Sequence, residues 1–239
     1  FYSYGPLGKL LKNKVEGNLR KVFQSHGLWE VECPIVLPDT VWKASGHLDT
    51  FVDRAVVCSK CEGVFRADKL IEESYDVSAD AFSDQQLLNF ISENKIRCPS
   101  CKGEFIYDIK RESLMMKTWV NDIDASLRPE TATVTYLPFK RYYEFFRRKL
   151  PIGVFQIGKA FRNEISPRQH VLRSREFTQA ESQLFIDPKG KNDWDKFEDV
   201  KKEKLPFWSH KRQDADKEPE MISVGDAIEK KYLRSKSYA

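Results

Sequence analysis

The stretches FRNEISPR (residues 161–168) and RSREFTQAE (residues 173–181) decide the fold and the chemistry that this chain can support. Residues 154–162 alternate in the manner of a β-strand, and residues 173–185 form a second strand of similar character. A strand, a loop and a strand in this order predict an antiparallel hairpin with an enlarged tip. On the first strand, small side chains beside Gly158 leave room for a ligand.

One face of the predicted hairpin carries the residue types of a nucleotide site. Arg162 and Glu164 lie two apart on the first strand, and Arg173, Phe177 and Glu181 lie at intervals of four on the second, so each set shares a face. Arginine holds phosphate through its planar fork, phenylalanine stacks on a base, and glutamate accepts from an amine. A polar edge in which arginine and glutamate merely neutralise each other is the alternative, but it leaves the phenylalanine unexplained.

The composition is that of a chain with a packed core. Of 239 residues, 41% are hydrophobic and 13% aromatic, and 40 Lys+Arg face 36 Asp+Glu. These values exclude a disordered chain, a collagen-like repeat and a membrane bundle. No apolar run approaches the roughly 20 residues of a spanning helix, and we expect a cytoplasmic protein without membrane contact.

Positive charge is concentrated in one segment. Residues 140–175 contain ten Lys/Arg and two Glu, which leaves the remainder of the chain net negative. Such a run is often only a solvated face, but within a balanced chain it can also mark a phosphate site.

Four of the five cysteines form two C-x-x-C pairs, at residues 58–61 and 98–101. Disulfides are the alternative, and the odd cysteine count and the absence of a secretory signal argue against them. Two such pairs favour a tetrahedral four-thiolate zinc site, structural because no coordination position stays open. Gly63 and Gly103 supply flexible backbone after each pair. The predicted ligands are Cys58, Cys61, Cys98 and Cys101.

The remaining pattern predicts a small number of elements. We expect helices over residues 6–24, over 81–93 and over 131–149, the last kinked or started by Pro138. A strand is expected over residues 31–37. Residues 39–55 are expected as loop and strand, and residues 187–239 as an exposed polar insertion. Residues 228–238 are expected as the start of a helix that the chain does not complete.

The hairpin sequence resembles motif 2 of the class II aminoacyl-tRNA synthetases, and more narrowly that of glycyl-tRNA synthetases of the archaeal and eukaryotic type. The stretch YGPLG (residues 4–8), with the helix and strand after it, resembles motif 1, and KASGH (43–47) resembles the loop after it. The stretch LRPETA (127–132) is similar to the segment with the glycine-binding glutamate. The cysteine insertion is like that of the archaeal enzymes, and the resemblance covers roughly residues 1–185.

The resemblance implies ATP-dependent formation of glycyl-adenylate and transfer of glycine to tRNA-Gly, with ATP, Mg²⁺ and structural Zn²⁺. Arg162 would be the catalytic residue, on the α-phosphate and the glycine carboxylate. Glu164 would accept from the adenine amine and Phe177 would stack on adenine. The further residues implied are Arg168 and Arg173 near the β and γ phosphates, and Glu130 and Glu181 on the glycine ammonium.

Two departures from the family pattern stand out. Thr133 replaces the glutamine that follows the RPETA segment. Motif 3 and the anticodon-binding domain are absent, so we expect an N-terminal portion that is inactive alone and acts with a C-terminal half that carries motif 3, whether as a separate chain or within a longer one.

The predicted fold is α+β, a partial class II antiparallel sheet with flanking helices and an inserted zinc ribbon. The expected domains are residues 1–55 (motif 1 part), 56–108 (zinc ribbon), 109–186 (motif 2 part) and 187–239 (polar insertion). The resemblance also implies a homodimer through motif 1. The competing function is a non-catalytic class II synthetase-like module that binds RNA or acts as an accessory.

Overall fold

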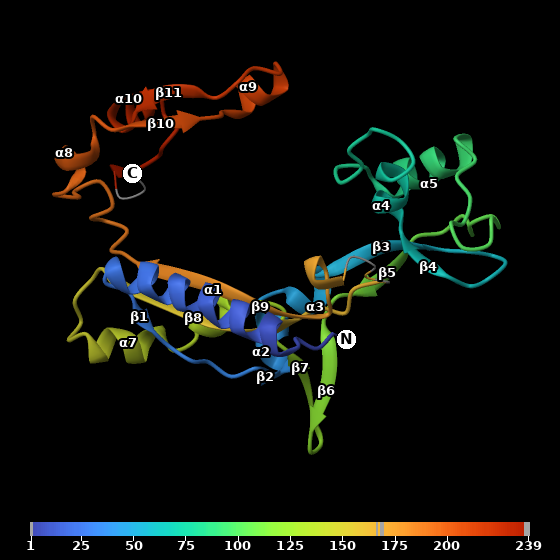
Figure 1. Ribbon diagram of the computed structural model, residues 1–239, viewed down its shortest axis with the longest axis horizontal. Coiled ribbons are helices and arrows are strands. Elements are labelled where there is room, and N and C mark those ends of the chain that lie inside the picture. The colour runs from blue at the N-terminus through green and yellow to red at the C-terminus, as the bar shows by residue number, and fades with distance from the viewer. Residues whose placement is uncertain (1, 166, 168–169, 237–239) are drawn as a thin grey trace. The chain divides into compact units, whose positions relative to one another are not determined.

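The computed structural model describes residues 2–165, 167 and 170–236 (Figure 1). The chain forms two compact units, one of Phe1–Lys140 with Val154–Gln183 and the other of Arg141–Gly153 with Leu184–Ala239. The first unit holds the cysteine pairs and most of the predicted site. Its sheets have the strand orders β1-β8-β9, β2-β7-β6 and β4-β3-β5.

Helix α1 (Pro6–Ser25) confirms the predicted N-terminal helix. Pro6 opens it, where a missing N–H costs nothing, and Gly27 follows its end with a left-handed φ of 75°. No residue of α1 is buried within the chain, although the Phe23 ring packs on Phe155 at 4.8 Å. Most of the apolar stripe on α1 therefore faces outward.

The single strand expected over residues 31–37 is wrong. Two short strands take its place, β1 (Trp29–Glu30) and β2 (Val36–Pro38). Pro34 lies between them, and because proline cannot donate to a ladder it interrupts the strand. Strand β1 pairs parallel with β8, so this sheet is not purely antiparallel as predicted.

Strands β8 (Ile152–Phe161) and β9 (Glu176–Phe185) are the two strands of the predicted hairpin and are neighbours in one sheet. The second strand begins three residues later than expected. The backbone N–H of Arg162 still bonds the carbonyl of Arg175 at 2.9 Å, just beyond both strand ends.

A second sheet joins β2, β7 (Ile123–Leu127) and β6 (Met116–Val120), all antiparallel, and Figure 1 shows β6 and β7 as a projecting hairpin. The helix expected over residues 131–149 is split into α6 (Ala132–Tyr136) and α7 (Phe139–Phe145). The break falls at Pro138, as predicted, because proline cannot continue the hydrogen-bond ladder.

The cysteine insertion has its own apolar core. Strand β3 (Val52–Val57) pairs with β4 (Val64–Arg66) and with β5 (Lys110–Ser113), so the stem of the insertion starts before residue 56 and ends after residue 108. Helix α5 (Asp84–Glu93) matches the predicted helix and starts at a capping box of Ser83 with Gln86. The core combines β3, α4 (Ala67–Glu72) and α5 through Val56, Ala67, Leu70, Ile71, Ala79, Leu87, Leu88, Ile91 and Ile96.

Several short helices escaped prediction, because each has too few residues to show a helical period. They are α2 (Asp39–Ala44) and α3 (His47–Thr50), where loop and strand were expected, and α4 in the insertion. Trp42 of α2 is fully buried beside Met115 and Val134. These helices carry the KASGH stretch toward the sheet.

The second unit is more ordered than a polar insertion suggests. Strands β10 (Lys204–Phe207) and β11 (Glu220–Ser223) pair antiparallel, and Phe197, Ile222 and Val224 are buried. The helices of this unit are α8 (Phe197–Val200), α9 (His210–Asp214) and α10 (Val224–Glu229). The expected helix thus lies a few residues earlier than predicted. The remaining element of the chain, the 3-10 turn η1 (His170–Leu172), lies in the hairpin loop. Within the described residues, no helix is long and apolar enough to cross a membrane.

Candidate functional site

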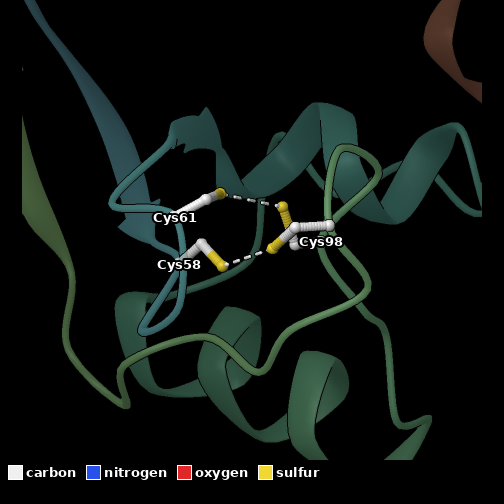
Figure 2. Close-up of side chains that lie close together, drawn as sticks. Cys58, Cys61 and Cys98 are labelled. Atoms are coloured by element: carbon white, nitrogen blue, oxygen red, sulfur yellow. Dashed lines mark hydrogen bonds between the residues drawn. The ribbon is translucent and has the colours of Figure 1, made fainter.

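The four predicted cysteine ligands converge at one point of the insertion (Figure 2). Their sulfur atoms all lie within 4.8 Å of one another, with Cys58 and Cys101 at 3.4 Å and Cys61 and Cys98 at 3.7 Å. A tetrahedral ion with Zn–S bonds of about 2.3 Å requires sulfur atoms about 3.8 Å apart. None of the four is in a disulfide. The geometry therefore fits a single four-thiolate ion.

The two halves of this cluster are built alike. In each, the residue after the pair, Glu62 or Lys102, has a left-handed φ (56° and 60°) and its N–H bonds the first cysteine carbonyl, at 3.0 and 2.9 Å. In each, the first cysteine N–H bonds the carbonyl of the following glycine, Gly63 or Gly103. Two equal turns from segments far apart in the sequence indicate that both position a pair of sulfur atoms for the same ligand.

The role predicted for the two glycines needs correction. Neither Gly63 nor Gly103 has a positive φ. A Cβ on Gly103 would lie 3.1 Å from the sulfur of Cys58, and one on Gly63 would lie 3.3 Å from that of Cys61. The nearest atoms to such a Cβ would be Cβ of Lys60 at 2.8 Å for Gly103 and the ring of Phe65 at 2.9 Å for Gly63. Glycine is needed here because these side chains and the sulfur atoms occupy the space of a Cβ.

Backbone N–H groups favour the thiolate form of Cys58, whereas at Cys61 the N–H of Gly63 is outweighed by the neighbouring thiols of Cys101 and Cys58, which raise its pKa to about 12. The backbone N–H of Cys61 has the largest effect and lowers the pKa of Cys58 to about 6. The N–H of Lys60 contributes less, and burial of the thiol opposes both. Thiolates are the form in which cysteine binds metal.

Arg162 lies at the centre of the second candidate site. Its Nε donates to the carbonyl of Pro129 at 3.1 Å. Its guanidinium lies over two rings, Phe177 at 5.3 Å and Phe51 at 5.4 Å from the ring centroids. The structure therefore brings together Arg162 and Phe177, as the sequence predicted, and adds Phe51, which the sequence analysis missed.

Glu164 and Arg173 are also brought together, but they bind each other. Glu164 is 8% exposed, and its Oε2 accepts from Nε and Nη2 of Arg173 at 2.9 and 2.6 Å. Such an arginine–carboxylate contact is strong and oriented. It is the neutralising pair that the alternative interpretation anticipated. Arg168 lies outside the described residues.

A buried carboxylate from the insertion stem adjoins this pair. Asp53 is 7% exposed and contacts Arg66 at 3.3 Å, while its Oδ2 has no partner among the described residues. Burial raises the pKa of Asp53, and the charge of Glu164 acts in the same direction against Arg66 and Arg173. The stem of the insertion and the hairpin tip thus share one electrostatic environment.

The two carboxylates predicted to bind an ammonium group are each held by a threonine. Glu130 accepts at Oε1 from the backbone N–H of Thr133 at 3.0 Å and from its hydroxyl, and it lies 3.6 Å from Nε2 of His47. Glu181 accepts at Oε2 from the N–H of Thr131 at 3.1 Å and from its hydroxyl. Since Glu130 and Thr131 are consecutive, one turn of chain connects both carboxylates.

The space expected beside Gly158 is filled by Arg128. A Cβ on Gly158 would clash with the guanidinium of Arg128, which is only 2% exposed. That guanidinium donates to the carbonyls of Lys159 at 2.7 Å and Cys33 at 2.8 Å, and to Oε1 of Gln156 at 3.1 Å. The small residue therefore admits a structural arginine, and the predicted room for a ligand is wrong at this position.

The residues that sequence reasoning missed act mainly as supports. Phe51, Arg128 and Thr131 occupy fixed positions around the site, and His47 stood in a stretch whose resemblance was noted without a role. The available signal for Thr131 was the sequence itself, in which Glu130 is followed by threonines at 131 and 133.

Comparisons with known proteins place this geometry in a class. Residues 119–214 match the family described as tRNA synthetase class II core domain (G, H, P, S and T), a range that includes both hairpin strands. Residues 119–214 are therefore similar to the core domain of the class II aminoacyl-tRNA synthetases.

The chain's curated relatives in that class are glycine–tRNA ligases. The chain is 43% identical to those of Thermococcus gammatolerans and Pyrococcus abyssi, over 100% of this chain and 42% of each relative. It is 46% identical to that of Methanococcus maripaludis over 95% of this chain and 41% of the relative. The chain is thus homologous to glycine–tRNA ligases along its whole length and spans about two-fifths of theirs. A solved structure titled as the RNA binding domain of threonyl-tRNA synthetase from Cryptosporidium parvum is 20% identical, covering 81% of this chain and 33% of that one, at a TM-score of 0.47, too low to define a common fold.

Proposed function

We propose that this chain is the N-terminal portion of a glycine–tRNA ligase and carries its ATP and glycine sites. The observation that supports this most is that Glu130 and Glu181 are joined through the adjacent residue Thr131, in the same turn whose Pro129 carbonyl accepts from Arg162. A module that only binds RNA has no use for two carboxylates that are held by neighbouring threonines of one turn. Identity of 43–46% to glycine–tRNA ligases along the chain points to the same reaction.

In the proposed reaction, the glycine carboxylate oxygen attacks the α-phosphorus of ATP. A new P–O bond forms and the bond to pyrophosphate breaks, giving glycyl-adenylate. A ribose hydroxyl of tRNA-Gly then attacks the glycyl carbonyl, and AMP leaves with the bonding electron pair. No protein nucleophile is needed, so the residues act by positioning and by stabilising charge.

Arg162 is proposed to hold the reacting carboxylate and the α-phosphate. Its Nε donates to Pro129, and among the described residues no hydrogen bond engages its Nη atoms, which can donate to a ligand. Since the guanidinium covers one face of Phe177, adenine would stack on the opposite face. Mg²⁺ would enter with the triphosphate, whose charge it neutralises.

Glu164 and Arg173 require one rearrangement. Arg173 binds Oε2 of Glu164, which leaves Oε1 to accept from the adenine amine. For Arg173 to reach the β or γ phosphate it has to turn away from Glu164. We propose that the triphosphate competes with Glu164 for this guanidinium.

Glu130 and Glu181 are proposed to bind the glycine ammonium. Each already accepts from a threonine through one oxygen, so its direction is set before glycine arrives. Carboxylates this close to the substrate Cα would also exclude larger amino acids.

The four-cysteine cluster is proposed to bind structural Zn²⁺. Sulfur spacing and the two equal turns support a filled tetrahedral site, which leaves no position for substrate.

We also propose a homodimer through α1. Leu7, Leu10, Leu11 and Val15 are 81%, 58%, 65% and 51% exposed, an apolar stripe that a second copy would cover. The protein would act in the cytoplasm with tRNA-Gly, together with the region that follows this chain in its relatives.

The test is glycine-dependent exchange between pyrophosphate and ATP, measured on a polypeptide that extends this chain by the region present in its relatives. Exchange with glycine, and at least about a hundredfold less with alanine or serine, is expected. Exchange with another amino acid would replace the substrate assignment, and no exchange with tRNA binding retained would favour the non-catalytic RNA-binding module.

A further inference from the structure

The C-terminal end of α7 carries an unpaired group of cations, here called the basic turn (residues 141–149). Arg141, Arg147, Arg148 and Lys149 are all exposed, and Glu144 is the sole acidic residue among them. Within residues 2–165, 167 and 170–236, none of these four cations forms an ion pair. Other cations of the same charged segment are neutralised, such as Lys159 by Glu176 at 2.7 Å.

The backbone of the basic turn holds two arginines in an unfavourable conformation. The N–H of Arg148 bonds the carbonyl of Tyr143 at 2.7 Å, and that of Arg147 bonds Glu144 at 3.0 Å, which together form a Schellman end of the helix. Arg147 and Arg148 have φ values of 55° and 60°. Glycine is the usual residue at the first of these positions, because a Cβ is strained there. An arginine side chain retained at such a position suggests that the side chain itself is used.

An exposed ring lies among these cations. Phe145 is 73% exposed, and it follows Arg141 by four residues on the same side of α7. Phe146 fixes its orientation through an edge contact at 5.1 Å, while Tyr142 packs on Phe185 at 6.5 Å and anchors the helix. The ring and the cations are thus presented by an anchored element.

We propose that the basic turn is an RNA-binding element that contacts phosphates through its arginines and stacks a base or ribose on Phe145. A polyanion matches four unpaired cations within nine residues, and arginine forks fit phosphate oxygens. An aromatic ring among cations is the combination used for single-stranded nucleic acid. A membrane surface would need a wider apolar face than a seven-residue helix offers.

This inference depends on the proposed function only for the identity of the RNA, tRNA-Gly. It adds a contact surface, residues 141–149, that contains none of the residues assigned to ATP or glycine. Formation of adenylate needs no tRNA, so the two proposals are measured separately.

The first test compares two charge-reversed pairs in this chain by titrating labelled tRNA at several salt concentrations. Arg147→Glu with Arg148→Glu should lower affinity about tenfold and reduce the slope of log affinity against log salt by about 2, since each lost phosphate contact removes about one unit. Lys189→Glu with Lys191→Glu, exposed residues of the same unit, makes the same change of net charge and should have a much smaller effect. Equal losses in both pairs, or no loss in the first, would overturn the proposal.

The second test separates binding from folding. Arg147→Gly should raise the melting temperature, because it relieves a left-handed Cβ, and should still weaken tRNA binding. A rise in melting temperature with unchanged tRNA affinity would mean that Arg147 only terminates the helix and does not bind RNA. Phe145→Ala should weaken binding by roughly fivefold or more if a base stacks on it.

In the extended polypeptide, Arg147→Glu with Arg148→Glu should raise KM for tRNA and leave glycine-dependent pyrophosphate exchange unchanged. If the unaltered protein showed no glycine-dependent pyrophosphate exchange, the proposed function would be contradicted, but the proposal that the basic turn binds RNA would not. Binding to vesicles of phosphatidylserine and phosphatidylcholine that depends on the two arginines, without dependence of tRNA binding on them, would assign the surface to membranes instead.

Discussion

The cysteine insertion and the β8–β9 hairpin differ in what holds them together. The ten-residue helix α5 buries Leu87, Leu88 and Ile91, whereas the twenty-residue helix α1 beside the hairpin sheet buries none of its residues. The insertion has an apolar core and a four-cysteine cluster of its own. The hairpin belongs to a sheet of three strands in which β8 buries Ile152, Val154, Phe155 and Ala160, and its tip is held by polar contacts of Arg162 and Glu164. The cysteine insertion is therefore stabilised by contacts within itself, whereas the hairpin depends on contacts with residues elsewhere in the chain.

The largest effect is expected from breaking the insertion. Cys98→Ser should remove one of four thiolates and unfold residues 56–108, since structural zinc contributes on the order of 10 kcal/mol or more in small modules. The hairpin should persist, because its contacts do not include the cluster. Metal analysis and hydrogen exchange check both statements. Protein purified without chelator and found free of zinc would contradict the assignment.

The next effect concerns Arg162 in the hairpin. Arg162→Ala should lower pyrophosphate exchange by about a hundredfold or more, because no other described side chain replaces a forked contact to the reacting phosphate. The fold should survive, since Arg162 is only partly buried. Exchange within a factor of about ten of the unaltered enzyme would show that the phosphate role is wrong.

Phe177 and Phe51 offer a matched pair around that arginine. Phe177→Ala should weaken ATP binding by roughly 1–3 kcal/mol, the usual scale for base stacking. Phe51→Ala removes the other ring under Arg162 and should affect ATP binding less, because the proposed stacking partner of adenine is Phe177. Equal losses of ATP affinity would mean that both rings serve only to position Arg162.

The smallest effect tests the support of Glu130. Thr133→Val keeps the size and the backbone N–H but removes the hydroxyl bond to Glu130, so KM for glycine should rise by about threefold to tenfold, the equivalent of roughly 1 kcal/mol. Thr118→Val in β6 is a control of the same chemistry away from Glu130. An unchanged KM for glycine would show that the backbone N–H of Thr133 suffices.

Short sequence patterns were sufficient to predict the features that depend on neighbouring residues. The spacing of Cys58, Cys61, Cys98 and Cys101 was enough to predict the cluster, and alternation was enough to place both hairpin strands. The Glu164–Arg173 pair could be named only as an alternative, because strand faces do not show which charges meet across a loop. Arg128 filling the space beside Gly158 was not predictable, since the two lie 30 residues apart on different elements. The resemblance supplied the roles that spacing could not.

The glycine assignment rests most directly on Glu130 and Glu181, and steady-state kinetics of Glu130→Gln and Glu181→Gln in the extended polypeptide test it. Each change removes one charged hydrogen bond to the ammonium, worth about 1.5–3 kcal/mol, and touches no phosphate. KM for glycine should therefore rise far more than KM for ATP. Equal rises for glycine and ATP would mean that the two carboxylates only hold the sheet and the threonine turn in place, and the amino-acid site would have to be sought elsewhere.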